Sequence, residues 1–347
     1  MGLVDKLKQN KSIVYTLSGG AAYGLAHIGV LKYLEEAGVR PVAIAGTSMG
    51  AIVGGLYAYG YEAAQIEQIS ERVRSLELVK LFFPSFPRGG IIDTDGIRDF
   101  FYGFIQDVRI EDLPVKFRSV AVDINTGEEI IFDRGRLIDA IIASMSIPAV
   151  FKPYYYAGRY LVDGGLVNNL PWDIAQTMGD INIVVDVAPQ SKQPDPECLF
   201  TSDIVESGSG EPEIGKRKHG DNGKHENRLK SEAFGEQLKK LIQSIQNGKD
   251  SFSVKELAAR FSRATEEKRA VQGLPEIITH MMAIIHESTQ SPPKNTPIKS
   301  VYLHIDLMKY ALNDFHKADE IIDEGYRTAQ EDAKFSKEIE KLSRKVS

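Results

Sequence analysis

Short apolar runs alternate with helical patterns over the first 190 residues of the chain. These runs are β-prone and too short for helices, which is typical of buried strands. They stand at residues 13–17, 42–45, 160–162 and 182–185. After the first run, Ile28, Leu31 and Leu34 repeat on one face of a helix. Short strands that alternate with helices favour an α/β fold with a mostly parallel sheet, covered on both faces.

One predicted helix is apolar on nearly every side. It covers about residues 49–59, directly after the run at 42–45, and Gly60 should end it. A helix of this composition has no face suited to water, so we expect it to be buried. The helix after it, over about 66–73, is amphipathic instead.

Two later patterns add strands. Residues 117–123 and 129–132 alternate or run apolar around a turn at 125–127, which is the pattern of a hairpin. A late strand is expected at 301–305, and a helix at about 316–330. A strand that recurs so late indicates that the C-terminal third returns to the first sheet.

A polar stretch interrupts the pattern near the middle of the chain. Residues 203–230 are mostly Gly, Ser, Asn, Pro and mixed charge. Such a segment cannot bury enough apolar surface to offset the entropy of ordering. We therefore expect a surface insertion at about 191–250 within a domain at 12–330. An N-terminal extension at 1–11 and a charged tail at 331–347 would flank that domain.

Composition and charge narrow the classes of protein. Hydrophobic residues make up 42% of the 347 residues, enough for a large core, so global disorder is excluded. The 42 basic and 48 acidic residues leave a formal net charge of -6, which gives no electrostatic footprint for nucleic acid. Cys198 is the only cysteine, so neither an intramolecular disulfide nor a zinc site of several thiolates can form.

The first residues carry no secretory pattern. No apolar h-region of a signal peptide follows Met1, so we expect a cytoplasmic protein. A transient contact with a membrane surface and export without a signal peptide both stay compatible with the sequence. The aromatic, proline-broken run at 81–87 would suit a mouth for acyl chains, or else a loop folded over the core. The oligomeric state is not predicted.

Gly46-Thr47-Ser48-Met49-Gly50 fits the G-x-S-x-G pattern of a nucleophile elbow. An elbow needs a buried strand before the serine and a helix directly after it, and the apolar pattern predicts both. The start of that helix would aim its dipole and free N–H groups at Ser48 Oγ. The alternative is a plain strand–helix turn in which Ser48 caps the helix.

The first predicted strand ends in a glycine-rich loop with Gly19, Gly20, Ala21 and Gly24. Such a loop presents successive backbone N–H groups to an anion. A phosphate-binding P-loop would need Lys-Ser/Thr after Gly24, and a dinucleotide fingerprint would need glycine at 21. An oxyanion hole needs only N–H donors, which Ala21 and Ala22 can supply. A tight turn for helix packing is the alternative.

A serine nucleophile needs a base, and the histidines are poor candidates for it. They lie in the polar insertion, on a predicted helix, within a strand, or, as His27, before the serine. No spacing typical of a metal site is present. Asp163 instead offers a carboxylate directly after a strand, where Gly164 and Gly165 leave room for a substrate. The alternative is an aspartate that only forms an Asx-turn.

Together, the three patterns in this order resemble bacterial patatin-like phospholipases. The family pattern is a glycine-rich oxyanion loop, a G-x-S-x-G nucleophile and a D-G-G/A base, which correspond here to 19–24, 46–50 and 163–165. Further similar stretches stand at 25–31, 144–151 and 167–171. The similarity is dense over about 13–190 and returns near 302–327.

The resemblance implies a three-layer α/β/α sandwich and a Ser–Asp dyad that needs neither histidine nor cofactor. By this carry-over, Ser48 attacks an ester carbonyl and Asp163 takes its proton. The N–H groups of Gly19, Gly20 and Ala21 would hold the oxyanion. The implied substrate is a lipid ester, cleaved as by a phospholipase A or a lysophospholipase.

Two residues depart from the family pattern. Ala21 stands where a third glycine is usual, and Tyr23 stands where a basic residue is common. If position 21 takes a positive φ, alanine costs about 1–2 kcal/mol there. The missing basic residue removes a positive charge near the developing anion. These two residues keep open a catalytically weak or silent interaction protein. Two further alternatives are a carboxylesterase for short soluble esters and, more distantly, a nucleotide-binding module.

Overall fold

The structure is a computed structural model, and it describes residues 11–73, 94–148, 150–188 and 297–346. All of these residues belong to one compact unit of the chain. The predicted insertion at 191–250, the aromatic run at 81–87 and nearly all of the N-terminal extension lie outside the described residues. The domain limits therefore stay predictions.

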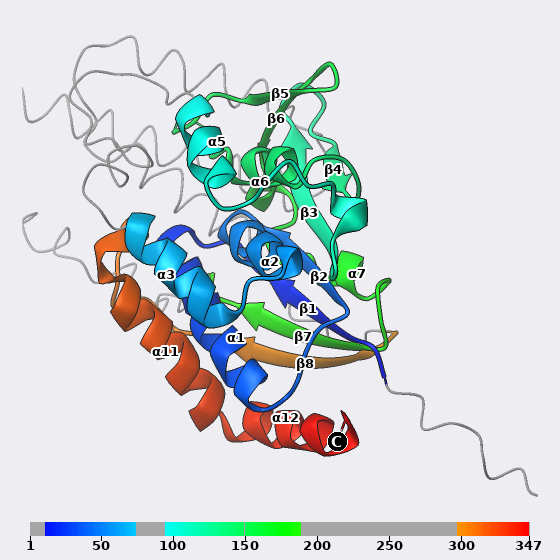
Figure 1. Ribbon diagram of the computed structural model, residues 1–347, viewed down its shortest axis with the longest axis vertical. Coiled ribbons are helices and arrows are strands. Elements are labelled where there is room, and N and C mark those ends of the chain that lie inside the picture. The colour runs from blue at the N-terminus through cyan, green and yellow to red at the C-terminus, as the bar shows by residue number, and fades with distance from the viewer. Residues whose placement is uncertain (1–10, 74–93, 149, 189–296, 347) are drawn as a thin grey trace, which may run out of the picture. The chain divides into compact units, whose positions relative to one another are not determined.

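A mixed sheet forms the centre of the described part (Figure 1). Its parallel strands are β1 (Ile13–Leu17), β2 (Ala43–Thr47), β3 (Lys116–Asp123), β7 (Ile181–Asp186) and β8 (Lys299–His304). Its antiparallel strands are β4 (Glu129–Phe132), β5 (Tyr154–Tyr156) and β6 (Arg159–Asp163). The order is β5-β6-β3-β2-β1-β7-β8, and β4 pairs with β3. The mostly parallel sheet and the hairpin around 125–127 are thus confirmed.

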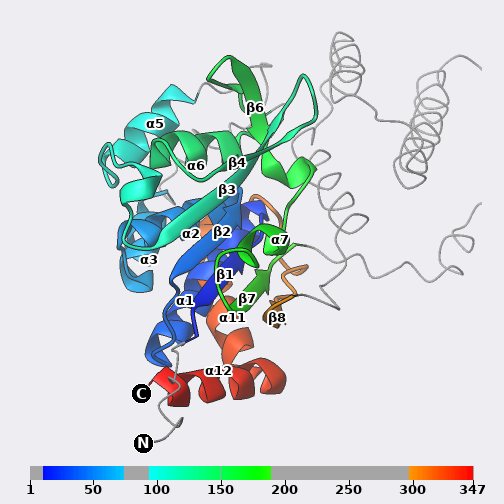
Figure 2. The ribbon, with the colours of Figure 1, turned by 90° about the vertical axis from the view of Figure 1, so that its right-hand side faces the viewer.

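Helices cover both faces of this sheet (Figure 2). One face carries α1 (Ala26–Glu36), α2 (Met49–Tyr59) and α6 (Leu137–Met145). Packed onto these helices are α3 (Ala63–Val73), α5 (Asp95–Tyr102) and α11 (Ala318–Glu331). The other face carries α7 (Trp172–Ala175). None of the helices in the described ranges has the length and apolar character needed to cross a membrane.

Successive side chains of a strand point to opposite faces of the sheet, so they pack against different helical layers. In β1, Tyr15 and Leu17 join the core on the side of α1 and α2, whereas Val14 joins the smaller cluster around Ile174 of α7. Every residue of β1 is buried, as expected for a central parallel strand with both faces covered. The fold is therefore the three-layer α/β/α sandwich that the sequence led us to expect.

The C-terminal third returns to the sheet, as the late strand predicted. β8 pairs in parallel with β7, and α11 crosses α1 at very short range. A Cβ on Gly29 would lie 1.9 Å from the Ile322 carbonyl oxygen, and a Cβ on Gly325 would lie 2.1 Å from the Ala26 carbonyl oxygen. Only glycine at these two positions lets the helix backbones approach so closely.

The charged tail expected at 331–347 contains a helix, α12 (Ala333–Val346). Phe335, Ile339 and Leu342 recur at intervals of four and three, and all three side chains are buried. They form one apolar stripe that packs α12 against α11 and β8. The abundant charge of this segment lies on the exposed side of an ordinary amphipathic helix.

Candidate active site

Ser48 stands at a sharp turn between β2 and α2. Its φ of 54° and ψ of -120° lie where L-residues are rare, as in a nucleophile elbow. Two glycines of this turn lie so close to neighbouring backbone atoms that they have no room for a side chain. A Cβ on Gly46 would lie 2.4 Å from the Gly50 carbonyl oxygen, and a Cβ on Gly50 would lie 2.2 Å from that of Leu17. The strand–turn–helix unit predicted around Ser48 is therefore present.

The side chains of Ser48 and Asp163 meet, although 115 residues separate them in the sequence. Ser48 Oγ donates a hydrogen bond to Asp163 Oδ2 over 2.6 Å. Sheet order brings them together, because β6 ends at Asp163 and only β3 separates it from β2. Asp163 is completely buried, and Ser48 is 6% exposed. The Ser48 hydroxyl makes no capping hydrogen bond to α2. The alternative interpretation, in which this serine caps the helix, is therefore wrong for its side chain.

Burial controls the protonation of Asp163. Removal from water raises the pKa of its carboxyl group to about 7, and the hydrogen bonds from Ser48 and Gly165 lower this pKa by less. Gly165 N–H donates to Asp163 Oδ1 over 2.7 Å. Gly164 has no room for a side chain, since a Cβ there would lie 2.4 Å from the Val120 carbonyl oxygen. A carboxyl group with a pKa near 7 can exchange a proton at neutral pH.

The C-terminal end of α6 holds both members of this pair. Ser144 Oγ accepts the backbone N–H of Ser48 over 2.9 Å, and the Ser146 carbonyl oxygen accepts that of Asp163 over 2.9 Å. Both serines are fully buried. The sequence marked the stretch at 144–151 only through its resemblance to a family, and no pattern assigned these serines a role.

The glycine-rich loop after β1 lies against the elbow. A Cβ on Gly19 would come within 3.1 Å of Ser48 Cβ, and a Cβ on Gly24 would come within 2.3 Å of Met49 Cγ. The Gly19 amide donates to the Asn169 carbonyl oxygen over 3.0 Å. Asn169, which the sequence marked only as part of the similar stretch at 167–171, therefore fixes the start of the loop and occupies one of the three amides expected to hold an oxyanion.

The other two amides expected to hold an oxyanion belong to Gly20 and Ala21. Neither amide has a hydrogen-bond partner within the part of the chain that the structure describes. Ala21 takes a φ of 48°, in the left-handed region that alanine adopts only at a cost of about 1–2 kcal/mol. Position 21 therefore does require a positive φ, and this chain meets that requirement with a strained alanine.

His27 lies next to the loop, and its ring bonds to the backbone of Ser18 instead of to Ser48 or Asp163. Its side chain is completely buried, and its Nε2 lies 2.8 Å from the Ser18 carbonyl oxygen. Burial lowers the pKa of His27 to about 4, so the ring is neutral and donates Nε2–H to that carbonyl. His304 and His316 lie near other carboxylates, and the remaining histidines are outside the described residues. Among the residues in view, no three potential ligands cluster around a metal position.

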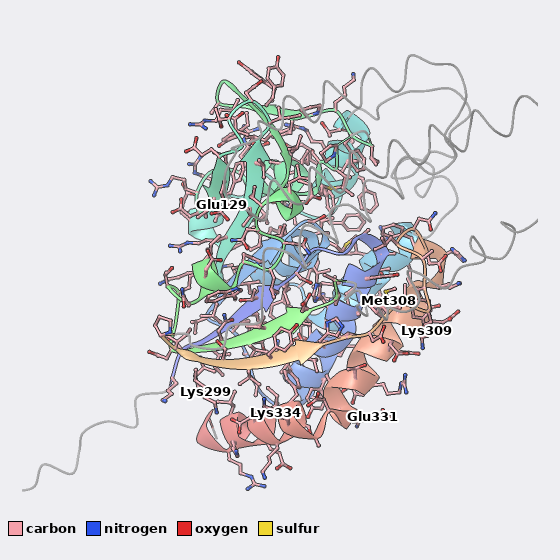
Figure 3. All side chains as sticks on the ribbon, turned by 180° about the vertical axis from the view of Figure 1, so that it is seen from behind. Glu129, Lys299, Met308, Lys309, Glu331 and Lys334 are labelled. Atoms are coloured by element: carbon pink, nitrogen blue, oxygen red, sulfur yellow. The ribbon has the colours of Figure 1, made fainter. Side chains whose placement is uncertain are left out.

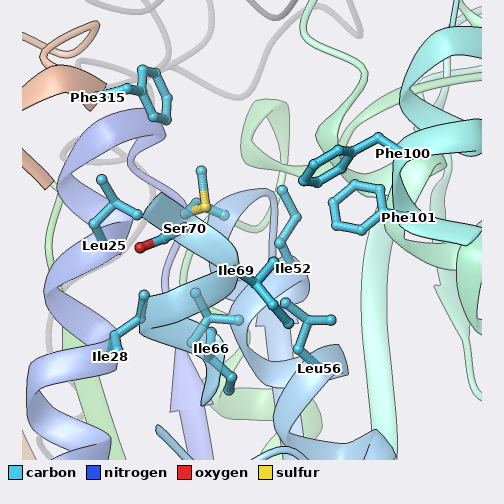
Figure 4. Close-up of a pocket in the computed structure, with 12 residues that line it drawn as sticks. Leu25, Ile28, Ile52, Leu56, Ile66, Ile69, Ser70, Phe100, Phe101 and Phe315 are labelled. Carbon is cyan, nitrogen blue, oxygen red and sulfur yellow. The ribbon is translucent and has the colours of Figure 1, made fainter. Parts of the chain in front are cut away.

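An apolar slot is lined by Met49, the residue after Ser48, and by side chains of the surrounding helices (Figure 4). The slot lies between α1, α2, α3 and α5. Its lining residues are Leu25, Ile28, Met49, Ile52, Val53, Leu56, Ile66, Ile69, Ser70, Phe100, Phe101 and Phe315. Ser70 is the single polar side chain among them, and its hydroxyl donates to the Glu67 carbonyl oxygen over 2.7 Å. A slot of this composition suits a hydrocarbon chain.

The matched family covers the part of the chain that holds this site. Residues 15–175 match the model of the patatin-like phospholipase family. This range includes the glycine-rich loop, the elbow at Ser48 and Asp163. Over these residues the chain is similar to the patatin-like phospholipase family, in line with the resemblance that its sequence indicated.

Relatives and solved structures are similar over part of their length. An uncharacterized NTE family protein of Mycobacterium tuberculosis is 38% identical over 179 residues, which are 50% of this chain and 49% of that protein. Patatin-like phospholipase domain-containing protein 6 of Mus musculus is 34% identical over 187 residues, 52% of this chain and 14% of that protein. The chain thus spans about half or less of these relatives. VipD from Legionella pneumophila is similar with a TM-score of 0.40 and 11% identity, over 96% of this chain and 66% of that chain.

Proposed function

We propose that this chain is a serine acyl-ester hydrolase that cleaves lipid esters with a dyad of Ser48 and Asp163. One observation carries the proposal: a buried hydroxyl at a strained elbow donates to a buried carboxyl group over 2.6 Å. The adjacent loop adds two amides that have no partner among the described residues. A nucleophile, a base and anion donors are the groups that acyl transfer needs.

In the first step, Ser48 Oγ attacks the carbonyl carbon of the ester while its proton passes to Asp163 Oδ2. A pKa near 7 lets the carboxylate accept this proton at neutral pH. The carbonyl electrons move onto oxygen, and the N–H groups of Gly20 and Ala21 hold the resulting oxyanion. When the intermediate collapses, the alcohol leaves with the proton from Asp163, and the acyl group stays on Ser48.

Water then releases the acyl group. Asp163 takes a proton from the water molecule as its oxygen attacks the acyl carbon, and the same two amides hold the second oxyanion. As the carboxylic acid leaves, the proton returns from Asp163 to Ser48 Oγ. No histidine is needed, because the carboxyl group touches the serine hydroxyl directly. The Gly165 amide and the Ser144 hydroxyl keep the two groups aligned.

The apolar slot supports a lipid substrate. Met49, the residue after the nucleophile, is part of its wall, so an acyl chain whose carbonyl lies at Ser48 can enter it. Each CH₂ group that leaves water gains about 0.8 kcal/mol. The family description and the name of the mouse relative both specify a phospholipase. We therefore assign glycerophospholipid esters, cleaved as by a phospholipase A or a lysophospholipase, as the substrate class.

Labelling with a fluorophosphonate tests the dyad, because this probe reacts with activated serines. We expect labelling of the wild-type chain, none of Ser48→Ala, and labelling of Asp163→Asn that is slower by about 10²-fold or more. Ser119→Ala is the control, since the one partner of its buried hydroxyl among the described residues is the Ala140 carbonyl oxygen, and its loss should leave labelling intact. Equal labelling of the wild type and Ser48→Ala would refute the proposal.

Two alternatives keep the same scaffold. A carboxylesterase for short esters would prefer butyryl to palmitoyl esters, whereas the apolar slot favours the opposite order. The strained φ of Ala21 favours a catalytically weak or silent protein. A folded wild-type chain that binds no fluorophosphonate would support this silent form, and a series of p-nitrophenyl esters with and without micelles separates the two enzymes.

A further inference from the structure

A distant segment of the chain is bonded to the oxyanion loop. The Ala22 N–H donates to the Leu312 carbonyl oxygen over 3.0 Å. The Tyr23 hydroxyl donates to the Tyr310 carbonyl oxygen, 287 residues later in the sequence. Both acceptors belong to residues 307–315, which follow β8 and which we call the clamp segment.

The loop needs support from outside. Ala21 keeps a positive φ of 48°, and the amides of Gly20 and Ala21 make no hydrogen bond within the described ranges. Gly19 is tied down on one side of these two residues, and Ala22 and Tyr23 are tied to the clamp segment on the other. The two free amides therefore keep their direction only while both sides are held.

The clamp segment is itself anchored to the body of the unit. Its buried side chains are Leu307, Tyr310, Leu312 and Phe315. Between them, Met308 and Lys309 lie at the surface (Figure 3), and Lys309 forms an ion pair with Glu324 of α11. Since α11 itself packs closely on α1, the clamp segment is linked through α11 to the body of the unit.

We infer that Tyr23 is a positioning residue and that the clamp segment is part of the active site. Through its bond to this segment, Tyr23 keeps the N–H groups of Gly20 and Ala21 directed at the substrate oxygen beside Ser48. This inference rests on the proposed function. It extends the site beyond residues 15–175, the range that matches the family.

The test compares two tyrosines that make the same kind of bond. The buried Tyr15 hydroxyl donates to the Val39 carbonyl oxygen over 2.7 Å, away from the loop. Tyr23→Phe and Tyr15→Phe each remove one such bond from the full chain. Both variants are assayed for kcat and KM on a p-nitrophenyl butyrate substrate, whose short chain makes little use of the apolar slot. Hydrogen exchange of the amides at 18–26 is measured in parallel.

We expect Tyr23→Phe to lower kcat by about fivefold to tenfold at an unchanged KM, because the amides act mainly on the transition state. Exchange at 18–26 should accelerate by a similar factor. Tyr15→Phe should change each quantity by less than about twofold, since its bond does not reach the loop. Adding Ala21→Gly to Tyr23→Phe should restore part of kcat, because glycine adopts the φ of the loop without strain. If Tyr23→Phe alone folds poorly, the double variant is compared with Ala21→Gly to measure the loss of the same bond.

The outcomes separate this inference from the proposed function. If the wild-type chain neither labels nor turns over esters, the proposed function fails. Faster exchange at 18–26 in Tyr23→Phe alone then still supports the clamp, and unchanged exchange overturns it. If the chain is active and Tyr23→Phe behaves like Tyr15→Phe in kcat and in exchange, the bond of Tyr23 is merely structural and the inference is wrong.

Discussion

At the scale of residues, Asp163 occupies a position that carboxylates normally avoid. It is completely buried, and among the described residues only the Ser48 hydroxyl and the Gly165 amide compensate for the lost water. Two other residues of the site hold costly backbone angles, Ser48 with a φ of 54° and Ala21 with a φ of 48°. Strain and a perturbed carboxyl group that gather in one place are features of functional sites.

The raised pKa of Asp163 predicts the pH dependence of catalysis. The base must be ionised, so kcat/KM for ester hydrolysis should fall about tenfold per unit as the pH drops below about 7, and should level off above it. A profile on a neutral ester that does not itself titrate measures this directly. A rate that stays constant between about pH 5 and pH 8 would contradict the role of Asp163 as base.

The same group predicts a pH-dependent stability. The pKa of Asp163 is raised from 3.8 when unfolded to about 7 when folded, so between these values the folded state holds the proton more tightly. The free energy of unfolding should therefore fall as the pH rises through this window, by roughly 4 kcal/mol in all. Asp163→Asn carries no charge and should be more stable than the wild type at about pH 8, by an amount that vanishes toward about pH 4. Urea unfolding at both pH values checks this, and equal stability at the higher pH would contradict it.

At the scale of elements, the sequence predicted what is encoded locally. The buried helix α2 and the turn before it follow from an apolar run, the glycine spacing and Gly60, all within one short stretch. The residues that hold Ser48 and Asp163 in place were not predictable in this way. Ser144 bonds to an amide 96 residues away, and a buried serine has no pattern of its own. Asn169 holds Gly19 through its backbone carbonyl oxygen and through its side-chain Nδ2, which donates to the Gly19 carbonyl oxygen over 3.3 Å. The two residues are 150 positions apart, so no local pattern marks this pair.

The slot between α2 and α3 predicts a limit on acyl-chain length. Ile69 lines it, so Ile69→Trp should fill it, lower kcat/KM on palmitoyl esters by about tenfold or more, and leave butyryl esters nearly unchanged. Ile131→Trp, at an exposed position of β4, is the control for the added indole. Equal losses on both chain lengths would place the acyl chain elsewhere.

At the scale of the whole described unit, a late strand and helix return to the first sheet, and this was predictable from their apolar patterns. Their contribution to the site was not. The clamp segment offers two backbone carbonyl oxygens to the glycine-rich loop, and no side-chain pattern in the sequence marks such acceptors. We infer that the support of the loop depends on the close crossing of α11 with α1, where Gly325 meets the backbone of Ala26.

Gly325→Ala tests this dependence. The added Cβ would lie 2.1 Å from the Ala26 carbonyl oxygen, so the helices must separate, at a cost of about 1–3 kcal/mol in the free energy of unfolding. Because α11 anchors the clamp segment through Lys309 and Glu324, fluorophosphonate labelling of Ser48 should also slow, although this substitution lies far along the chain. In Gly103→Ala the nearest atom would be 3.2 Å from the new Cβ, so this control should alter neither quantity by much. Loss of stability with an unchanged labelling rate would show that α11 supports the fold without supporting the loop.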